Sequence, residues 1–174
     1  MMDLKSAIRS VPDFPKKGIV FRDITTLLLD KTAFKQSIDE LESFCQGKKI
    51  DKILGIESRG FIFGGILADR LGAGFVPIRK KGKLPAKTFV QEYQLEYGTD
   101  SIEIHSDALA AGDSVLIVDD LIATGGTLEA ACKLVEKNKA IVTGIAALVE
   151  LTFLNGRQKL NKYDIISLVK YDSE

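Results

Sequence analysis

The stretch Val115–Thr127, which reads Val-Leu-Ile-Val-Asp-Asp-Leu-Ile-Ala-Thr-Gly-Gly-Thr, decides the fold of this 174-residue chain. It begins with an apolar, largely β-branched run that is typical of a strand buried on both faces of a parallel sheet. The pair Asp119-Asp120 ends that run, and a loop to Thr127 leads into a segment with apolar residues at helical spacing. The stretch therefore predicts a buried strand, a polar loop and a helix in succession.

The same succession occurs earlier in the chain. Lys52–Ile56 is a short apolar run, Glu57–Gly60 is polar, and a helix is predicted from Phe61 to about Leu71. Further strands are predicted at Gly74–Ile78, Ser101–His105, Val142–Leu151 and Ile165–Val169. Strands that alternate with helices indicate an α/β fold with a mainly parallel sheet and helices on both faces.

Composition and charge limit the classes of function. The 24 basic and 24 acidic side chains give a formal net charge of zero, whereas a duplex-binding protein normally carries a basic excess. The first residues lack the apolar core of a signal peptide, and no stretch approaches the about 20 apolar residues that span a bilayer. Cys45 and Cys132 are predicted to be free, buried thiols. We therefore expect one cytoplasmic domain over residues 1–174 that binds neither nucleic acid nor membrane.

The loop after the strand at Val115–Val118 has the residue types of a phosphate site. Its two glycines let backbone amides turn toward a ligand, Thr124 and Thr127 add hydroxyl donors, and the following helix start supplies free N–H groups. Asp119 and Asp120 repel a phosphate, so they suit ribose hydroxyls or a Mg²⁺ that in turn holds phosphates. A phosphate cradle beside a clamp for a diol predicts a phosphorylated sugar as the ligand.

Two commoner phosphate motifs are missing from the sequence. It has no G-x-x-x-x-G-K-[ST], and no G-x-G-x-x-G follows a predicted strand, which argues against kinase-like and dinucleotide-binding proteins. The segment from Lys80 to Gly98 is long for a connection inside a compact domain, and such segments are usually functional or mobile.

Asp119–Thr127 resembles the motif with which type I phosphoribosyltransferases bind phosphoribosyl pyrophosphate (PRPP). Other segments, in order along the chain, resemble the adenine phosphoribosyltransferase family; they are Phe14-Pro15, Gly18–Ile24, Glu57–Phe61, Arg79–Pro85, Leu95–Gly98 and Glu103–His105. The resemblance implies a type I phosphoribosyltransferase-like α/β fold with a mostly parallel five-stranded sheet flanked by helices. It also implies a small N-terminal hood over about residues 1–30 and a mobile lid over about residues 80–98.

The resemblance further implies which residues bind PRPP. They are Asp119, Asp120, Ala123, Thr124, Gly125, Gly126, Thr127, Ser58, Arg59 and Lys83. In similar enzymes the loop holds the 5-phosphate, the two aspartates hold the ribose hydroxyls, and the lid brings Lys83 to the site. Ser58 and Arg59 lie against the pyrophosphate, where the Arg59 guanidinium stabilises the charge of the leaving group and so contributes to catalysis.

The other substrate is implied to lie under the hood. Backbone groups of Val20 and Arg22 are expected to read the edge of adenine, with Phe21 and Leu151 nearby. Glu96, in the lid, is similar to the family's candidate catalytic acid/base, which takes a proton from the purine as its nitrogen bonds to C1 of ribose.

The implied reaction joins adenine to PRPP to give AMP and pyrophosphate, a step of purine salvage. Mg²⁺ is the implied cofactor, held mainly through PRPP rather than by protein ligands, with a water-mediated contact to Asp119 or Asp120 as an option. Members of the family are usually homodimers. Two alternatives stay open: a phosphoribosyltransferase for another purine base, and a PRPP-sensing regulator that binds without catalysis.

Overall fold

The computed structural model describes residues 2–94 and 98–174, and its centre is one large sheet. From edge to edge the strands are β5 (Thr88–Gln94), β6 (Thr99–His105), β4 (Gly74–Lys80), β3 (Lys52–Ile56), β7 (Ser114–Ile122), β8 (Ile141–Leu151) and β9 (Ile165–Tyr171). Strands β4, β3, β7, β8 and β9 are mutually parallel, as expected for strands joined by helical crossovers. The α/β fold with its mostly parallel sheet is confirmed.

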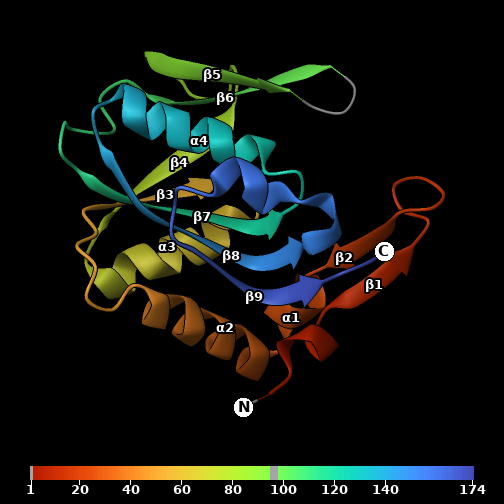
Figure 1. Ribbon diagram of the computed structural model, residues 1–174. Coiled ribbons are helices and arrows are strands. Elements are labelled where there is room, and N and C mark those ends of the chain that lie inside the picture. Colours follow the sequence, from red (N-terminus) through yellow and green to blue (C-terminus); the bar gives the residue numbers. More distant parts are fainter. Residues whose placement is uncertain (1, 95–97) are drawn as a thin grey trace.

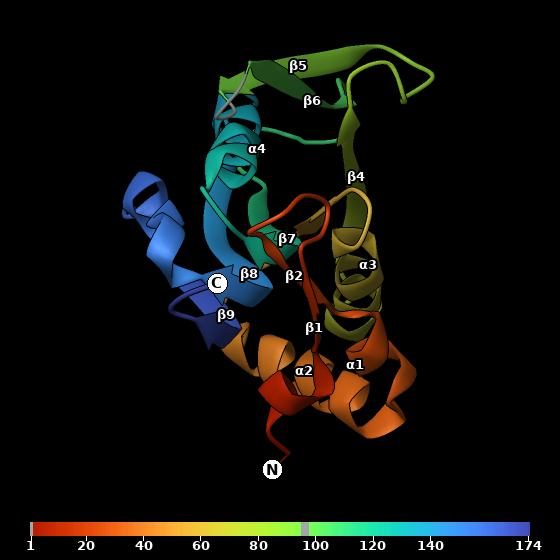
Figure 2. The same cartoon turned by 90° about the vertical axis from the view of Figure 1, so that its right-hand side faces the viewer.

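The sheet has two more strands in the described residues than the five that were predicted. Strand β6 pairs antiparallel with the end of β4, where Arg79 lies opposite Glu103, and β5 returns along β6 as a hairpin. Figures 1 and 2 show this hairpin over α4 (Gly126–Lys137), away from the parallel strands. Seven of the 19 residues of the predicted lid, 80–98, therefore form strand β5 and belong to the sheet.

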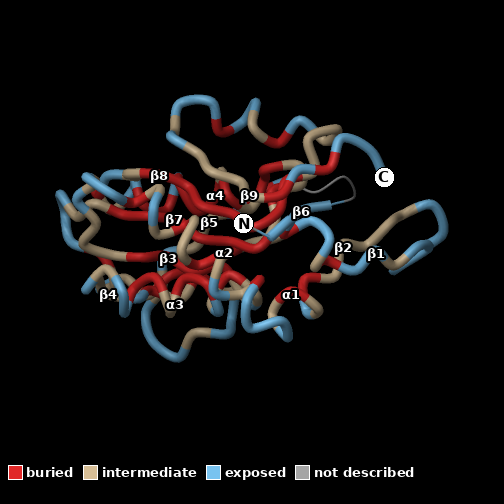
Figure 3. Tube along the Cα trace, turned by 90° about the horizontal axis from the view of Figure 1, so that it is seen from below, coloured by how far each residue is buried: buried red, intermediate tan, exposed pale blue. Residues whose placement is uncertain are grey.

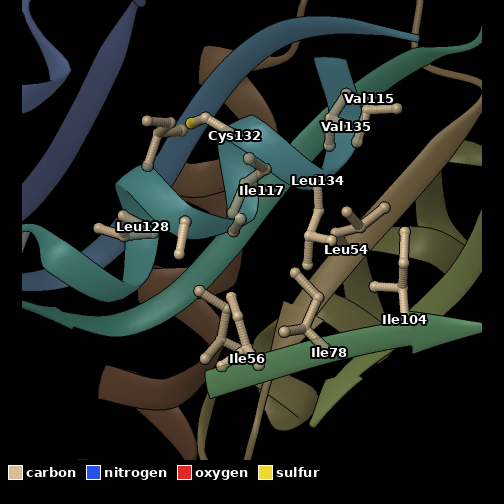
Figure 4. Close-up of a cluster of buried hydrophobic side chains, with 14 of the residues drawn as sticks. Leu54, Ile56, Ile78, Ile104, Val115, Ile117, Leu128, Cys132, Leu134 and Val135 are labelled. Atoms are coloured by element: carbon tan, nitrogen blue, oxygen red, sulfur yellow. The ribbon is translucent and has the colours of Figure 1, made fainter. Parts of the chain in front are cut away.

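Helices cover both faces of the parallel strands. Helix α4 lies on one face, and α1 (Thr25–Leu29), α2 (Lys31–Phe44) and α3 (Gly60–Leu71) lie on the other (Figure 1). Each face has its own apolar cluster; the one under α4 includes Leu54, Ile117 and Val135 (Figure 4). Figure 3 shows that β3, β7 and β8 are buried along most of their length, as their apolar sequences predict.

Residues near the N-terminus form the predicted hood. After a 3₁₀ turn at Leu4–Ala7, the strands β1 (Arg9–Pro12) and β2 (Val20–Asp23) make an antiparallel hairpin. In Figure 1 the strands β7, β8 and β9 point toward this hairpin, so the hood lies at the carboxyl edge of the sheet. The side chain of Glu174 accepts a hydrogen bond of 2.8 Å from the backbone N–H of Val20, which ties the end of the chain to the hood.

None of the helices in residues 2–94 and 98–174 combines the length and the apolar character that a membrane crossing requires.

Candidate active site

The predicted phosphate loop connects β7 to α4 at the carboxyl edge of the sheet. Strand β7 continues to Ile122, so Asp119 and Asp120 lie within the strand and not, as predicted, after it. The extension follows from pairing, because Leu121 and Ile122 still lie opposite residues of β8. The loop then turns sharply at Gly125, whose φ of +77° lies in the left-handed region that glycine adopts without strain.

A cavity of about 250 Å³ opens over this loop. Its lining residues are Ile56, Glu57, Arg59, Lys80, Tyr93, Ile102, Asp119, Asp120, Leu121, Ala123, Thr124, Gly125, Gly126, Thr127 and Leu128. Eight of the ten residues predicted to bind PRPP are among them, and the other two are Ser58 and Lys83. We call this space the loop cavity.

The acidic pair is buried beside the loop. Burial and the neighbouring charge of Asp120 raise the pKa of the Asp119 carboxyl well above its usual range. Its Oδ1 accepts the backbone N–H of Asp120 at 2.8 Å. Gly60 makes this packing possible, because a Cβ there would lie 2.7 Å from the carbonyl oxygen of Val118. Helix α3 can therefore begin directly against the two carboxylates.

Arg59 stands where the loop cavity meets the hood. It is the N-cap residue of α3, and its Nε donates to Oδ2 of Asp120 at 2.5 Å. Its guanidinium carbon lies 5.6 Å from the centre of the Phe21 ring in β2. One cation therefore contacts both the acidic pair and the hood.

A second cavity, of about 130 Å³, lies under the hood on the other side of Arg59. It is lined by Ile19, Val20, Phe21, Arg22, Ile24, Arg59, Asp120, Leu121, Val149 and Leu151. All four residues predicted to contact the base are among these. We call this space the hood cavity, and it shares Arg59, Asp120 and Leu121 with the loop cavity.

Two predicted residues lie beside the loop cavity without lining it. Lys83 Nζ donates to Glu57 Oε1 at 2.8 Å, and Arg79 Nε donates to Oε2 of the same carboxylate at 2.8 Å. Although burial alone raises the pKa of Glu57, these hydrogen bonds lower it overall. Ser58 lies between the lining residues Glu57 and Arg59. Glu96 lies outside the described residues.

The sequence interpretation missed several lining residues. Lys80 is the basic residue among them, and its ammonium group is paired with Asp100 and hydrogen-bonded to Tyr93 Oη at 3.1 Å. Lys80 lies in Arg79–Pro85, a segment that carries the family resemblance, so the sequence contained a signal although no role was predicted for this lysine. Leu121 and Val149 of the hood cavity are apolar strand residues, and nothing in the sequence separates them from core residues.

Across the described residues, no group of three or more His, Cys, Asp or Glu side chains is arranged to hold a metal ion.

Comparison with known proteins gives consistent matches. The model of the phosphoribosyl transferase domain family matches residues 25–171. The adenine phosphoribosyltransferase of Thermoanaerobacter sp. (strain X514) is 60% identical over 169 residues, which cover 97% of this chain and 98% of that protein.

Solved structures agree with this. That of adenine phosphoribosyltransferase from Thermoanaerobacter pseudethanolicus superposes with a TM-score of 0.93 at 60% identity, covering 97% of this chain and 98% of the other. The Saccharomyces cerevisiae enzyme, solved with an imino-altritol bisphosphate and adenine, gives a TM-score of 0.89 at 46% identity, covering 95% and 96% of the two chains.

Proposed function

This chain belongs to the phosphoribosyl transferase domain family, and from that membership we propose that it is an adenine phosphoribosyltransferase. It converts adenine and PRPP to AMP and pyrophosphate, a reaction of purine salvage. One structural observation carries the assignment beside the relatives: a polar cavity over a glycine-rich loop and a smaller, largely apolar cavity meet at Arg59. A phosphorylated ribose and a flat base that must be joined need two such spaces with a common wall.

PRPP occupies the loop cavity in this proposal. The backbone amides of 123–127 and the hydroxyls of Thr124 and Thr127 bind the 5-phosphate at the start of α4. Asp119 and Asp120 bind the ribose hydroxyls, because hydroxyl groups can donate to a carboxylate that repels phosphate. The raised pKa of Asp119 follows from burial beside a second carboxylate, and a bound diol adds hydrogen bonds to those that the pair accepts from the Asp120 N–H and from Arg59.

The pyrophosphate is placed beside Arg59, with Ser58 and Lys83 at its margin. Arg59 is the cation that lines both cavities. In the transition state it stabilises the negative charge on the pyrophosphate as the bond between pyrophosphate and C1 of ribose loosens. Lys83 Nζ lies 2.8 Å from Glu57 Oε1 and does not line the loop cavity, so its side chain takes part by moving toward the pyrophosphate. In this proposal the lid over about residues 80–98 closes over PRPP and so brings Lys83 to the pyrophosphate.

Adenine occupies the hood cavity. The apolar faces of Phe21 and Leu151 pack on the ring, while backbone groups of Val20 and Arg22 read its edge. The backbone N–H of Val20 already donates to Glu174, so the carbonyl of Val20 is the group left for the base. Glu96 is the proposed acid/base that takes the purine proton.

Mg²⁺ fits the residues of the loop cavity. Mg²⁺ usually binds through one or two carboxylates together with substrate phosphates, and Asp119 and Asp120 provide such oxygens beside the phosphate loop. When bound, the ion neutralises charge on the pyrophosphate. A homodimer and a cytoplasmic location complete the proposal, and light scattering checks the first of these.

The test is conversion of substrates by the purified protein. PRPP and Mg²⁺ are mixed with adenine, hypoxanthine, guanine or xanthine in turn, and nucleotide and pyrophosphate are measured. We expect AMP to form with strong preference over the other nucleotides. Preference for another base overturns the adenine assignment, and PRPP binding without conversion of any base identifies a non-catalytic PRPP-binding protein instead.

A further inference from the structure

The chain after β8 supports the phosphate loop from behind. It forms the 3₁₀ turns η2 (Thr152–Leu154) and η3 (Gly156–Leu160), which lie beside α4 in blue in Figure 1. A Cβ added to Gly156 would overlap the carbonyl oxygen of Ala123 and lie 3.0 Å from the amide nitrogen of Gly125. A Cβ added to Gly125 would in turn lie 2.5 Å from the carbonyl oxygen of Gly156. The two backbones therefore touch at a point where only glycine fits on either side.

The residue after Gly156 is fixed by a buried carboxylate. Arg157 Nε donates to both carboxylate oxygens of Glu150, at 2.8 and 2.9 Å, and the Glu150 side chain is only 5% exposed. Arg157 also donates to the Ile165 carbonyl and, at 3.1 Å, to Ser167 Oγ. Ser167 donates to Glu150 Oε2 at 2.5 Å, which completes a closed network of charged hydrogen bonds.

Both ends of the segment are anchored as well. The single hydroxyl proton of Thr152 is shared between two acceptors, the Asp172 carboxylate at 2.6 Å and the backbone carbonyl of Tyr171 at 3.0 Å. At the other end Leu160 is fully buried in the cluster under α4. Gly156 is thus held at a fixed position between two anchors, in direct contact with the loop.

The same network lies next to the phosphate loop and next to the hood cavity. Glu150 lies opposite Ile122 in the sheet, and Ile122 immediately precedes the loop. Leu151, the next residue along β8, lines the hood cavity. Arg157 Nε holds Glu150 from the side of η3, so these contacts connect the strand residue before the loop with a residue about 30 positions further along the chain.

We propose that Gly156, Arg157 and Glu150 form a positioning unit for the 5-phosphate loop. The unit touches no substrate; it fixes the carbonyl of Ala123 and the amide of Gly125 so that the loop amides face the phosphate. This inference rests on the proposed function, because it assigns the loop to the 5-phosphate of PRPP. It predicts that substitutions in the unit weaken the binding of PRPP but not the binding of adenine.

The test compares Gly156→Ala and Arg157→Lys with the wild type. The matched controls are Gly65→Ala, where an added Cβ meets nothing within 4 Å, and Arg70→Lys, at a surface ion pair with Asp39 and Glu42. For each protein the KM for PRPP, the KM for adenine and kcat are measured, with the melting temperature and the calorimetric Kd for PRPP.

We expect Gly156→Ala to raise the KM and Kd for PRPP about tenfold or more, since a displacement of about 1 Å in a positioning element costs up to about 100-fold. The KM for adenine stays within about twofold, and both controls keep the wild-type KM and Kd for PRPP. Arg157→Lys keeps the positive charge but loses the planar guanidinium that bonds Glu150, Ile165 and Ser167 together. We therefore expect a smaller rise in the KM and Kd for PRPP. If Gly156→Ala does not fold, Arg157→Lys carries the test.

A purely structural role gives a different pattern. The melting temperature then falls in both variants while the KM and Kd for PRPP stay at the wild-type values, and this result overturns the inference. Failure of the proposed function is distinguishable from it. A wild type that binds PRPP without making AMP still tests the unit through Kd, and a wild type that does not bind PRPP overturns both proposals.

Discussion

The loop cavity and the hood cavity share a wall but are built in opposite ways. Nine of the ten residues from 119 to 128, all but Ile122, line the loop cavity and form most of it from one continuous piece of chain. The hood cavity combines three distant segments, 19–24, 120–121 and 149–151, with Arg59. The first presents charges, hydroxyls and backbone amides, and the second presents mainly apolar side chains and strand backbone. A contiguous polar site leaves a motif in the sequence, whereas a site assembled from strand residues does not.

The largest effect is expected at Arg59, the one cation among the three lining residues that the two cavities share. Arg59→Met keeps the apolar stem but removes the guanidinium that pairs with Asp120 and lies near Phe21. We expect kcat/KM to fall about 10²–10³-fold, the usual cost of losing one group that stabilises charge in a transition state. Steady-state kinetics with both substrates varied checks this. Arg70→Met, at an exposed ion pair, is the control, and activity within about tenfold of wild type contradicts the role.

Gly60→Ala perturbs the packing of α3 against the strand that carries Asp119. The new Cβ lies 2.7 Å from the Val118 carbonyl oxygen and pushes the start of α3 away from Asp119. We expect a loss of about 1–3 kcal/mol in the free energy of unfolding, as for other overpacked sites. Gly65→Ala, in the same helix with open space around it, should gain about 0.5–1 kcal/mol. Urea denaturation compares the two, and equal stabilities would show that Gly60 has no packing role.

The parallel core and the phosphate loop were predictable because each depends on local sequence. An apolar β-branched run gives a strand wherever it is buried, so β3 and β7 were found, and glycines beside hydroxyls and carboxylates gave the loop. The resemblance then supplied the hood residues Phe21 and Leu151, which no pattern in the chain distinguishes from core residues.

What the sequence did not predict depends on contacts between distant segments. Strand β5 lies in a stretch that looks like a polar loop, and it is a strand because Tyr93 packs in the cluster under α4 while β6 pairs along it. Strand β7 runs past Asp119 because β8 continues beside it. The contact of Gly156 with the loop joins residues about 30 positions apart, and a single sequence gives no sign of it.

Leu151→Ala enlarges the hood cavity only. Removing apolar contact with a small flat ligand costs about 1–3 kcal/mol in such cavities, so the KM for adenine should rise about tenfold or more while the KM for PRPP is unchanged. Leu154→Ala, three residues on and outside both cavities, is the control. If the two KM values rise together, the cavities are not separate binding sites.

The smallest effect is expected from Asp119→Asn. Burial, then the charge of Asp120, raises the pKa of Asp119 in the folded protein, so the free energy of unfolding falls as pH rises above 3.8, the ordinary value, toward the folded pKa. The amide removes this penalty and can still accept the Asp120 N–H. We expect a melting temperature about 2–4 °C higher at pH 7, equivalent to about 1 kcal/mol, and weaker PRPP binding.

Thermal melts from pH 8 to pH 4 check this prediction. The gain should shrink as pH falls, because the wild-type carboxyl becomes protonated. A variant that is less stable than wild type at pH 7 would show that the charged form of Asp119 is favoured in the unliganded protein.

A crystal structure of the protein with AMP tests the central claim most directly, because one nucleotide must fill both cavities at once. We expect the phosphate on the amides of 123–127, the ribose hydroxyls on Asp119 and Asp120, and the adenine ring against Phe21 and Leu151. AMP bound with its phosphate away from this loop, or its base outside the hood cavity, would contradict it.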